Sequence, residues 1–226
     1  GLDLDAFQGN TRSSPSGAAH FWGEPVFGYY NSSDEWVIRK QIEMLTLAGI
    51  DFIALETSNA VTYQSVTDVL FPIMLEYYNQ GWNVPKVMYY IANNNAENTT
   101  YPNTLREVYN YFYADDTYKD LWFCPNGKPM ITRHELASDK FLQTFDGGKY
   151  LDFFEFRTRQ WPISDYVKAD GASWMEFIYP QILHTDWLSI SVAQHYSVRF
   201  SDTVGTHGRG WNEKTQKNDH ENYGKG

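Results

Sequence analysis

The sequence is short of cysteine and of long apolar runs. Cys124 is the only cysteine among 226 residues, so an internal disulfide is impossible and the redox compartment is left open. No stretch approaches the roughly 18 consecutive apolar residues that a membrane-spanning helix needs. No signal peptide is recognisable in the chain. The sequence therefore predicts a protein without a membrane span.

Positive charge is also scarce. The chain has 18 Lys and Arg against 28 Asp and Glu, which gives a net charge of −10. This balance argues against nucleic acid or an anionic membrane surface as the main partner. The spacings of a Walker loop, a dinucleotide-binding glycine motif and a His-x-x-x-His or Cys-x-x-Cys metal site are all missing. We therefore predict neither a cofactor nor a metal site.

Aromatic residues, in contrast, are abundant and make up 17% of the chain. Most of them are expected to lie in a large aromatic core. A second interpretation is a sugar-binding cleft, because flat rings stack on pyranose faces while Tyr and Trp also offer polar groups. The composition alone leaves both interpretations open.

A capped helix, a glycine and an apolar strand are predicted between residues 32 and 59. The range 32–35 offers a capping box, and apolar residues then recur with helical spacing. Gly49 stands where a left-handed C-cap belongs. The apolar strand 50–55 is followed by Glu56, and in α/β folds chemistry gathers at the carboxyl ends of strands. Glu56 is therefore the first candidate catalytic residue.

Helices and strands alternate along the rest of the chain. Further helices are predicted at 63–80, from about 103 and at 138–145, and further strands at 85–91, 121–123, 128–132, 151–157, 174–179 and 187–192. The Asn126-Gly127 pair predicts a tight turn that joins two of these strands as a hairpin. Residues 1–33 are predicted to form a leading loop and residues 201–226 a polar tail.

This alternation predicts an α/β protein with a mainly parallel sheet. A doubly wound sheet and a (β/α)8 TIM-type barrel both fit the pattern. About six principal strands are recognisable, whereas a complete barrel has eight. The simplest interpretation is a single partial barrel domain, residues 1–226, that holds roughly the second to the seventh strand.

Several short motifs occur in an order that resembles a known family. They are His20-Phe21-Trp22-Gly23-Glu24-Pro25, the run 36–41, the junction 48–52, Gly127-Lys128-Pro129, Tyr179-Pro180-Gln181 and Ser191-Val192-Ala193-Gln194-His195. The order resembles that of bacterial (β/α)8-barrel proteins related to glycoside hydrolase families 99 and 71. The resemblance implies a glycan-hydrolysing barrel with a glycan as its partner, exported to the periplasm or outside the cell.

The resemblance also implies a late strand that carries catalytic carboxylates. Proteins of this type have a Trp-Asn-Glu-Trp-like strand end there. In this chain Trp211-Asn212-Glu213 is followed by Lys214-Thr215-Gln216, and no apolar strand precedes it. We therefore interpret Glu213 as a loop residue and expect the chain to be a fragment that lacks the first and last barrel strands.

Glycoside hydrolysis needs two carboxyl groups about 5–10 Å apart. Glu56 and Glu176 are the candidate catalytic pair, while Glu155 is expected to pair with Arg157. The candidate substrate-binding residues lie in the leading loop and at predicted strand ends: His20, Trp22, Glu24, Asn59, Asn93, Arg157, Gln181, Gln194 and His195. Two other functions stay open, a glycan-binding protein without catalysis on the same scaffold and a barrel enzyme with different chemistry.

Overall fold

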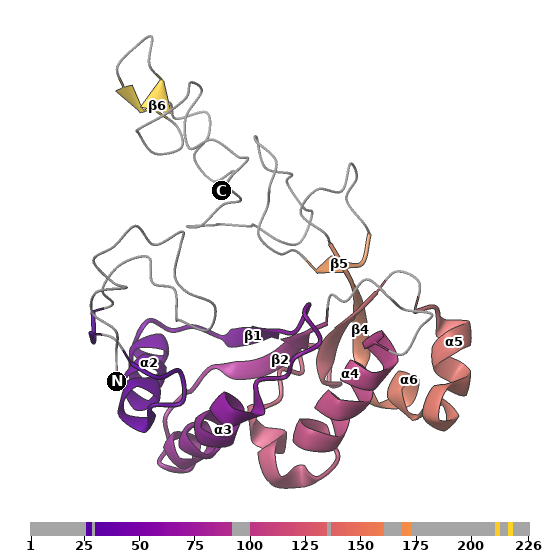
Figure 1. The fold of residues 1–226 in the computed structure, drawn as a ribbon, viewed down its shortest axis with the longest axis horizontal. Coiled ribbons are helices and arrows are strands. Elements are labelled where there is room, and N and C mark those ends of the chain that lie inside the picture. Colours follow the sequence, from indigo (N-terminus) through magenta and orange to yellow (C-terminus); the bar gives the residue numbers. More distant parts are fainter. Residues whose placement is uncertain are drawn as a thin grey trace, which may run out of the picture. The chain divides into compact units, whose positions relative to one another are not determined.

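The computed structural model describes the chain in several stretches. They are residues 26–28, 30–91, 100–134, 137–160 and 169–172, together with two short strands at 211–212 and 217–218. The chain divides into two compact units: a first unit of residues 1–49 and 63–84, and a second unit of residues 50–62 and 85–226. Figure 1 shows the helices and strands of both units.

The first unit is built around two helices, α2 (Glu35–Leu47) and α3 (Gln64–Asn79). Arg39 of α2 donates to the carboxylates of Glu35 at 2.9 Å and of Glu76 at 2.8 Å, so one guanidinium links the two helices. Its hydrogen bond lowers the pKa of Glu76. The buried side chains of both helices are mostly apolar: Val37, Ile38, Ile42, Leu70, Phe71, Ile73 and Met74.

The ends of α2 confirm one predicted signal and correct another. Asp34, rather than Ser32, is the N-cap, because its carboxylate accepts a hydrogen bond from the Val37 N–H at 3.1 Å. Aspartate caps a helix as well as serine does. The capping box predicted for 32–35 is therefore wrong. Gly49 has a φ of +71°, which confirms the predicted left-handed residue after the helix.

The second unit contains a parallel sheet of five strands. The strands are β1 (Phe52–Glu56), β2 (Lys86–Tyr90), β3 (Met130–Arg133), β4 (Glu155–Arg159) and β5 (Gly171–Ala172). They are hydrogen-bonded in the order β1-β2-β3-β4-β5 and curl into a half-barrel (Figure 1). A doubly wound sheet reverses its strand order at a switch point. The described strands contain no such reversal, so the α/β class is confirmed and the barrel alternative is favoured.

Helical segments connect the strands of the second unit. Between β2 and β3 lie α4 (Thr100–Val108), the π-helix η2 (Tyr109–Tyr113) and the 3-10 helix η3 (Asp116–Leu121). Between β3 and β4 lie α5 (Asp139–Thr144), the 3-10 helix η4 (Phe145–Gly148) and α6 (Lys149–Phe153). Two further strands, β6 (Trp211–Asn212) and β7 (Lys217–Asn218), pair antiparallel with each other.

The hairpin predicted for residues 121–132 is wrong, although its turn is present. Trp122 makes an isolated parallel bridge to Val87, and β3 pairs in parallel with its neighbours on both sides. Gly127 has a φ of +89°, so the Asn-Gly turn forms without two antiparallel strands around it. A local turn signal does not specify which strands pair across the sheet.

The strand predicted for 151–157 begins instead as the helix α6. Tyr150, Phe153 and Phe154 follow each other at helical spacing, and all three rings contact Tyr109, with ring centroids 5.2 to 6.1 Å apart. Two adjacent phenylalanines favour a strand locally, but this shared contact with η2 fixes the helical conformation. The strand β4 begins only at Glu155.

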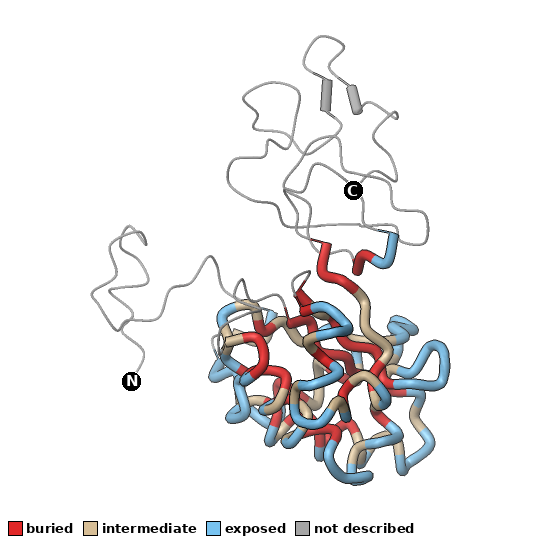
Figure 2. The backbone as a smooth tube through the Cα atoms, turned by 90° about the vertical axis from the view of Figure 1, so that its right-hand side faces the viewer, coloured by how far each residue is buried: buried red, intermediate tan, exposed pale blue. Residues whose placement is uncertain are grey.

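Aromatic side chains fill the helix side of this sheet and form what we call the aromatic layer. Neighbouring rings have centroids 4.8 to 6.4 Å apart, within the range that aromatic pairs prefer. The layer consists of Tyr89, Tyr109, Phe112, Tyr113, Trp122, Phe153 and Phe154. Figure 2 shows the buried residues concentrated along the strands and on parts of the helices.

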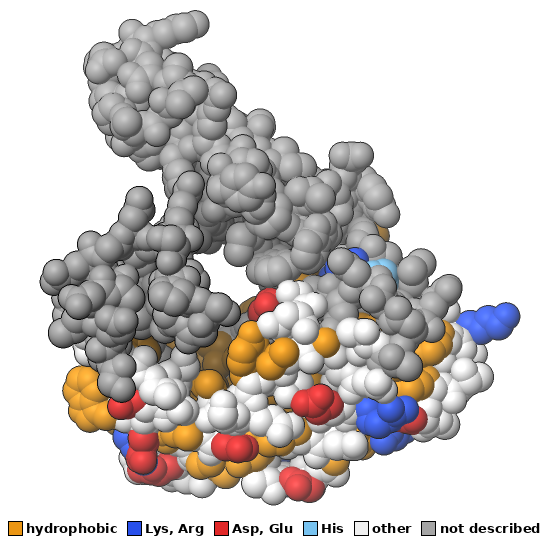
Figure 3. Space-filling model, viewed as in Figure 1, with side chains coloured by type: hydrophobic (Ala, Val, Ile, Leu, Met, Phe, Trp, Pro, Cys, Tyr) orange, Lys and Arg blue, Asp and Glu red, His pale blue; other side chains and the backbone are white. Residues whose placement is uncertain are grey.

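The surface of the described part is mixed in charge. On the face shown in Figure 3, acidic side chains are scattered, and Lys and Arg occur singly or in small groups rather than as a broad basic patch. Among the described helices, none combines the length and the hydropathy that crossing a membrane requires.

Candidate functional site

The register of the strands determines which side chains share a face of the sheet. Paired residues of parallel strands point to the same side, and successive residues alternate. Glu56 pairs with Tyr90, and Tyr89 pairs with Ile131. Tyr90 follows Tyr89 and Thr132 follows Ile131, so the Tyr90 and Thr132 side chains point to the same side of the sheet. Glu56 pairs with Tyr90 and therefore lies on that face too.

The same face continues across β3 and β4. Thr132 pairs with Arg157, and the alternation then adds Arg159 on β4 and His134 just after β3. These side chains stand at or near the carboxyl ends of their strands. We call this set the strand-end face: Glu56, Tyr90, Thr132, His134, Arg157 and Arg159.

The strand-end face is the concave side of the curved sheet. The Tyr90 hydroxyl donates a hydrogen bond to the carbonyl of Ala172 at 2.9 Å, although β2 and β5 are three strand positions apart. That separation corresponds to about 14 Å along a flat sheet. A tyrosine side chain is much shorter than this, so the sheet must curve around it. The Ala172 carbonyl also accepts from the Gln160 N–H at 2.9 Å.

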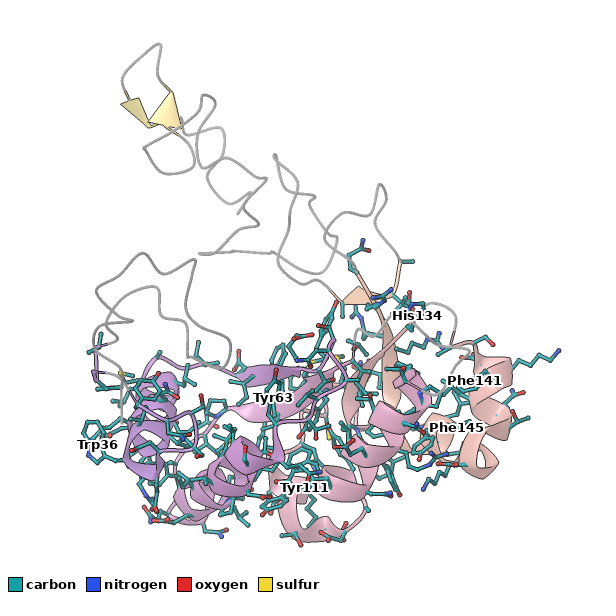
Figure 4. The ribbon with its side chains drawn as sticks, viewed as in Figure 1. Trp36, Tyr63, Tyr111, His134, Phe141 and Phe145 are labelled. Carbon is teal, nitrogen blue, oxygen red and sulfur yellow. The ribbon has the colours of Figure 1, made fainter. Side chains whose placement is uncertain are left out.

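His134 and Arg159 form a buried pair on this face. They directly follow Arg133 and Thr158, the last paired residues of the two strands, and they are 4% and 5% exposed. Nη2 of Arg159 lies 2.9 Å from Nε2 of His134. A guanidinium only donates hydrogen bonds, so Nε2 must accept and the imidazole is neutral with its proton on Nδ1. Figure 4 shows His134 beside β5, where the strands end.

Glu56 lies where the sequence predicts it, at the end of β1. The residue is half-buried, and its carboxylate accepts a hydrogen bond from the Ser58 N–H. The Thr57 N–H donates to the Tyr90 carbonyl at 3.0 Å, which extends the strand pairing beyond Glu56. The carboxylate is therefore held on a short turn that follows a regular strand, next to the strand that carries Tyr90.

Asn59 lies in the same turn but on its exposed side. Its side-chain oxygen accepts a hydrogen bond from the Val61 N–H at 3.1 Å. A bond to the backbone two residues on is the usual way in which asparagine shapes a turn. Asn59 therefore has a structural role here, and contact with a substrate stays a prediction.

Arg157 and Glu155 have partners other than each other. The Arg157 guanidinium donates to the backbone carbonyls of Asp170 at 3.2 Å and of Gly171 at 2.8 Å, and so holds the start of β5 against β4. Glu155 accepts instead from the side-chain amide of Asn126 at 2.8 Å. Arg157 thus helps to shape the strand-end face by fixing the connection between its strands.

The other predicted site residues lie outside the described residues. They are Glu176, His20, Trp22, Glu24, Asn93, Gln181, Gln194 and His195, and the predicted strands 174–179 and 187–192 also fall there. Their approach to the strand-end face stays a prediction. Within the described part of the chain, no group of three or more His, Cys, Asp or Glu side chains could hold a metal ion.

Four residues of the strand-end face are absent from the sequence prediction: Tyr90, Thr132, His134 and Arg159. One signal for them exists in β4, where charged residues at 155, 157 and 159 alternate with Phe156 and Thr158. This period of two indicates a strand with one polar face. No comparable pattern marks His134, because its pairing with Arg159 depends on the register between β3 and β4.

Comparison of the chain with protein-family models, curated proteins and solved structures gives no match. The resemblance to glycoside hydrolase families 99 and 71 therefore stays a prediction from the order of short motifs.

Proposed function

We propose that this protein is a carbohydrate-active enzyme that cleaves a polysaccharide or another glycan by hydrolysis. The strand-end face carries the proposal: it brings a carboxylate, a tyrosine hydroxyl, a neutral imidazole and a guanidinium to one concave surface. Barrel enzymes bind their substrates at the carboxyl ends of the strands. Sugar hydroxyls both donate and accept hydrogen bonds, so they match this mixture of groups.

We further propose that the five strands belong to a (β/α)8 barrel. Their sequential order and the Tyr90 contact across the concave side support this architecture. A barrel closes when strands of this kind continue around a common axis. Predicted strands at 174–179 and 187–192 are candidates for the continuation.

Glu56 is the proposed catalytic carboxylate among the described residues, and Glu176 is its proposed partner. In such a pair one carboxylic acid protonates the leaving-group oxygen of the glycosidic bond. The other carboxylate attacks the anomeric carbon directly or removes a proton from an attacking water. His134 and Arg159 would help to shape the substrate-facing surface through their mutual contact at 2.9 Å.

The decisive experiment compares Glu56→Gln with Glu43→Gln in the purified protein. Glu43 lies on α2, where it is paired with Lys40, and it serves as the matched surface control. Release of reducing ends is measured over a panel of polysaccharides and oligosaccharides, and glycan affinity is measured in parallel. We expect Glu56→Gln to lower kcat at least about 100-fold, a loss typical of a missing acid or base. Affinity should stay within about threefold, and Glu43→Gln should match the unmodified protein. Equal hydrolysis by both variants would remove Glu56 from the mechanism.

A glycan-binding protein without catalysis is the second candidate function. It is favoured by one observation: Glu56 is the single carboxylate in the strand-end face as defined within the described residues. Hydrolysis by the usual route needs two. Tight binding of a glycan that releases no reducing ends would establish this alternative. Absence of both binding and release over the panel would contradict both functions.

A further inference from the structure

A hollow on the first unit uses none of the residues of the strand-end face. It is open to solvent, has a volume of about 470 Å³ and lies at the C-terminal end of α3. Its lining residues are Tyr78, Asn79, Gly81, Trp82 and Asn83. Ligand sites in proteins typically have volumes of about 300–1,000 Å³. The hollow is therefore large enough for a small ligand or for one unit of a polymer.

The tryptophan of this hollow is held firmly by the end of the helix. Gly81 adopts a φ of +89°, and its N–H donates to the Tyr78 carbonyl at 2.9 Å. The Trp82 N–H donates to the Tyr77 carbonyl at 3.0 Å, and the two bonds together form a Schellman motif. The Trp82 and Tyr77 rings stack with centroids 4.7 Å apart. The indole is thus positioned before any ligand arrives, which reduces the entropy cost of binding.

The polar groups of the hollow are amides. Asn79 and Asn83 are both exposed and lie on either side of Gly81 and Trp82 in the sequence. Each amide offers donors and an acceptor. None of the described residues that line the hollow carries a carboxylate, ammonium or guanidinium group. The Schellman motif explains why Trp82 stacks on Tyr77. It does not explain why two amides and Tyr78 surround the same hollow.

We propose that this hollow binds a neutral hexose unit of a polysaccharide. A sugar ring combines an apolar face, which suits an aromatic ring, with hydroxyl groups, which suit amides. The site shares with the proposed function the class of ligand, but it uses different residues. Binding a polymer at a second point raises its effective concentration at the first. The hollow should therefore affect long glycans and leave short ones unaffected.

The test compares Trp82→Ala with Trp36→Ala. Trp36 is the matched control, because it is 56% exposed on α2 and contacts Phe27 rather than the hollow. The probes are a soluble neutral α-glucan, a β-glucan and a mannan, each as polymer and as short oligosaccharide. We expect Trp82→Ala to weaken binding of at least one polymer about tenfold, with oligosaccharide hydrolysis unchanged. Trp36→Ala should leave both measurements unchanged.

A second variant, Asn83→Ala, keeps the test decisive if Trp82→Ala does not fold. Its side chain is exposed, so we expect normal folding and about a threefold loss of polymer affinity. Unchanged polymer affinity in the variants that fold overturns the site, as does binding of a proline-rich peptide there in place of a sugar. If polymer affinity is unchanged but Glu56→Gln still abolishes hydrolysis, the proposed binding site in the hollow fails and the proposed hydrolysis stands. If the unmodified protein neither binds nor cleaves any glycan, both proposals fail.

Discussion

Tyr89 and Tyr90 are consecutive residues of β2 that lie on opposite faces of one sheet. Tyr89 belongs to the aromatic layer, where its ring centroid is 5.9 Å from that of Phe112. Tyr90 extends over the concave side and donates a hydrogen bond to the Ala172 carbonyl. Both residues are buried, yet one face is built from ring contacts and the other from hydrogen bonds. The two faces of this strand are therefore held together by different kinds of contact.

The polar side chains of the concave side are bonded either to the backbone or to each other. Thr132 is fully buried, and its hydroxyl accepts from the Ile91 N–H at 2.6 Å and donates to the Ile91 carbonyl at 3.1 Å. This hydroxyl therefore links β3 to the residue after β2 by two hydrogen bonds at the carboxyl end of the sheet. Loss of such a bond leaves a buried polar group unsatisfied, whereas loss of a ring contact leaves a cavity. The two faces should thus respond differently to substitution.

The largest effect is expected in the aromatic layer. Phe112→Ala should lower the free energy of unfolding by about 3–5 kcal/mol, because it removes a fully buried ring and leaves a cavity. Urea unfolding followed by circular dichroism measures the change. Phe141→Ala is the matched control, since Phe141 is only half-buried on α5, where it stacks on Phe145 (Figure 4). An equal loss in both variants would contradict a special role for the layer.

A smaller effect is expected on the concave side. Tyr90→Phe should lower the free energy of unfolding by about 1 kcal/mol, the usual net contribution of one hydrogen bond. The cost stays moderate because the Ala172 carbonyl keeps its bond from the Gln160 N–H. The same urea experiment measures it.

The matched control removes a hydroxyl from the other face. The Tyr113 hydroxyl is buried and has no hydrogen-bond partner among the described residues, and burial raises the pKa of Tyr113 well above its ordinary value. Tyr113→Phe should therefore leave stability unchanged or raise it, because a buried polar group without a partner is costly. A loss in Tyr113→Phe as large as that in Tyr90→Phe would erase the distinction between the two faces.

The same contrast explains what the sequence could predict. Local sequence signals were sufficient for features with a local cause. The helices α2 and α3, the glycine after α2, and the strands β1 and β2 lie close to their predicted ranges. Glu56 at the end of β1 was likewise predictable, because a carboxylate that ends an apolar run is visible in the sequence.

Features that depend on pairing between distant segments were not predictable. His134 meets Arg159, and Tyr90 meets Ala172, only because the strands between them adopt one particular register and curve. Likewise the helix α6 replaces a predicted strand start because its aromatic residues contact Tyr109. Periodicity within a short window carries no information about such partners.

The smallest effect should come from a charged contact at the edge of the aromatic layer. The Asp146 carboxylate accepts from the Arg106 guanidinium at 2.9 Å and from the Tyr150 hydroxyl at 2.6 Å. These bonds lower the pKa of Asp146 to about 2. Because this value is below the roughly 3.9 of an unfolded chain, the contact stabilises the fold above about pH 4 and is lost as the pH falls towards 2.

Asp146→Asn isolates this charge, because Asp146 has a φ of +48° and asparagine tolerates that left-handed conformation. We expect a smaller loss at pH 7 than for Tyr90→Phe, since exposed ion pairs are screened by solvent. The difference from the unmodified protein should shrink between pH 4 and pH 2. Phe112→Ala involves no titrating group, so its loss should stay constant over the same range. Parallel pH dependence in the two variants would show that packing and charge in the aromatic layer are coupled rather than separate.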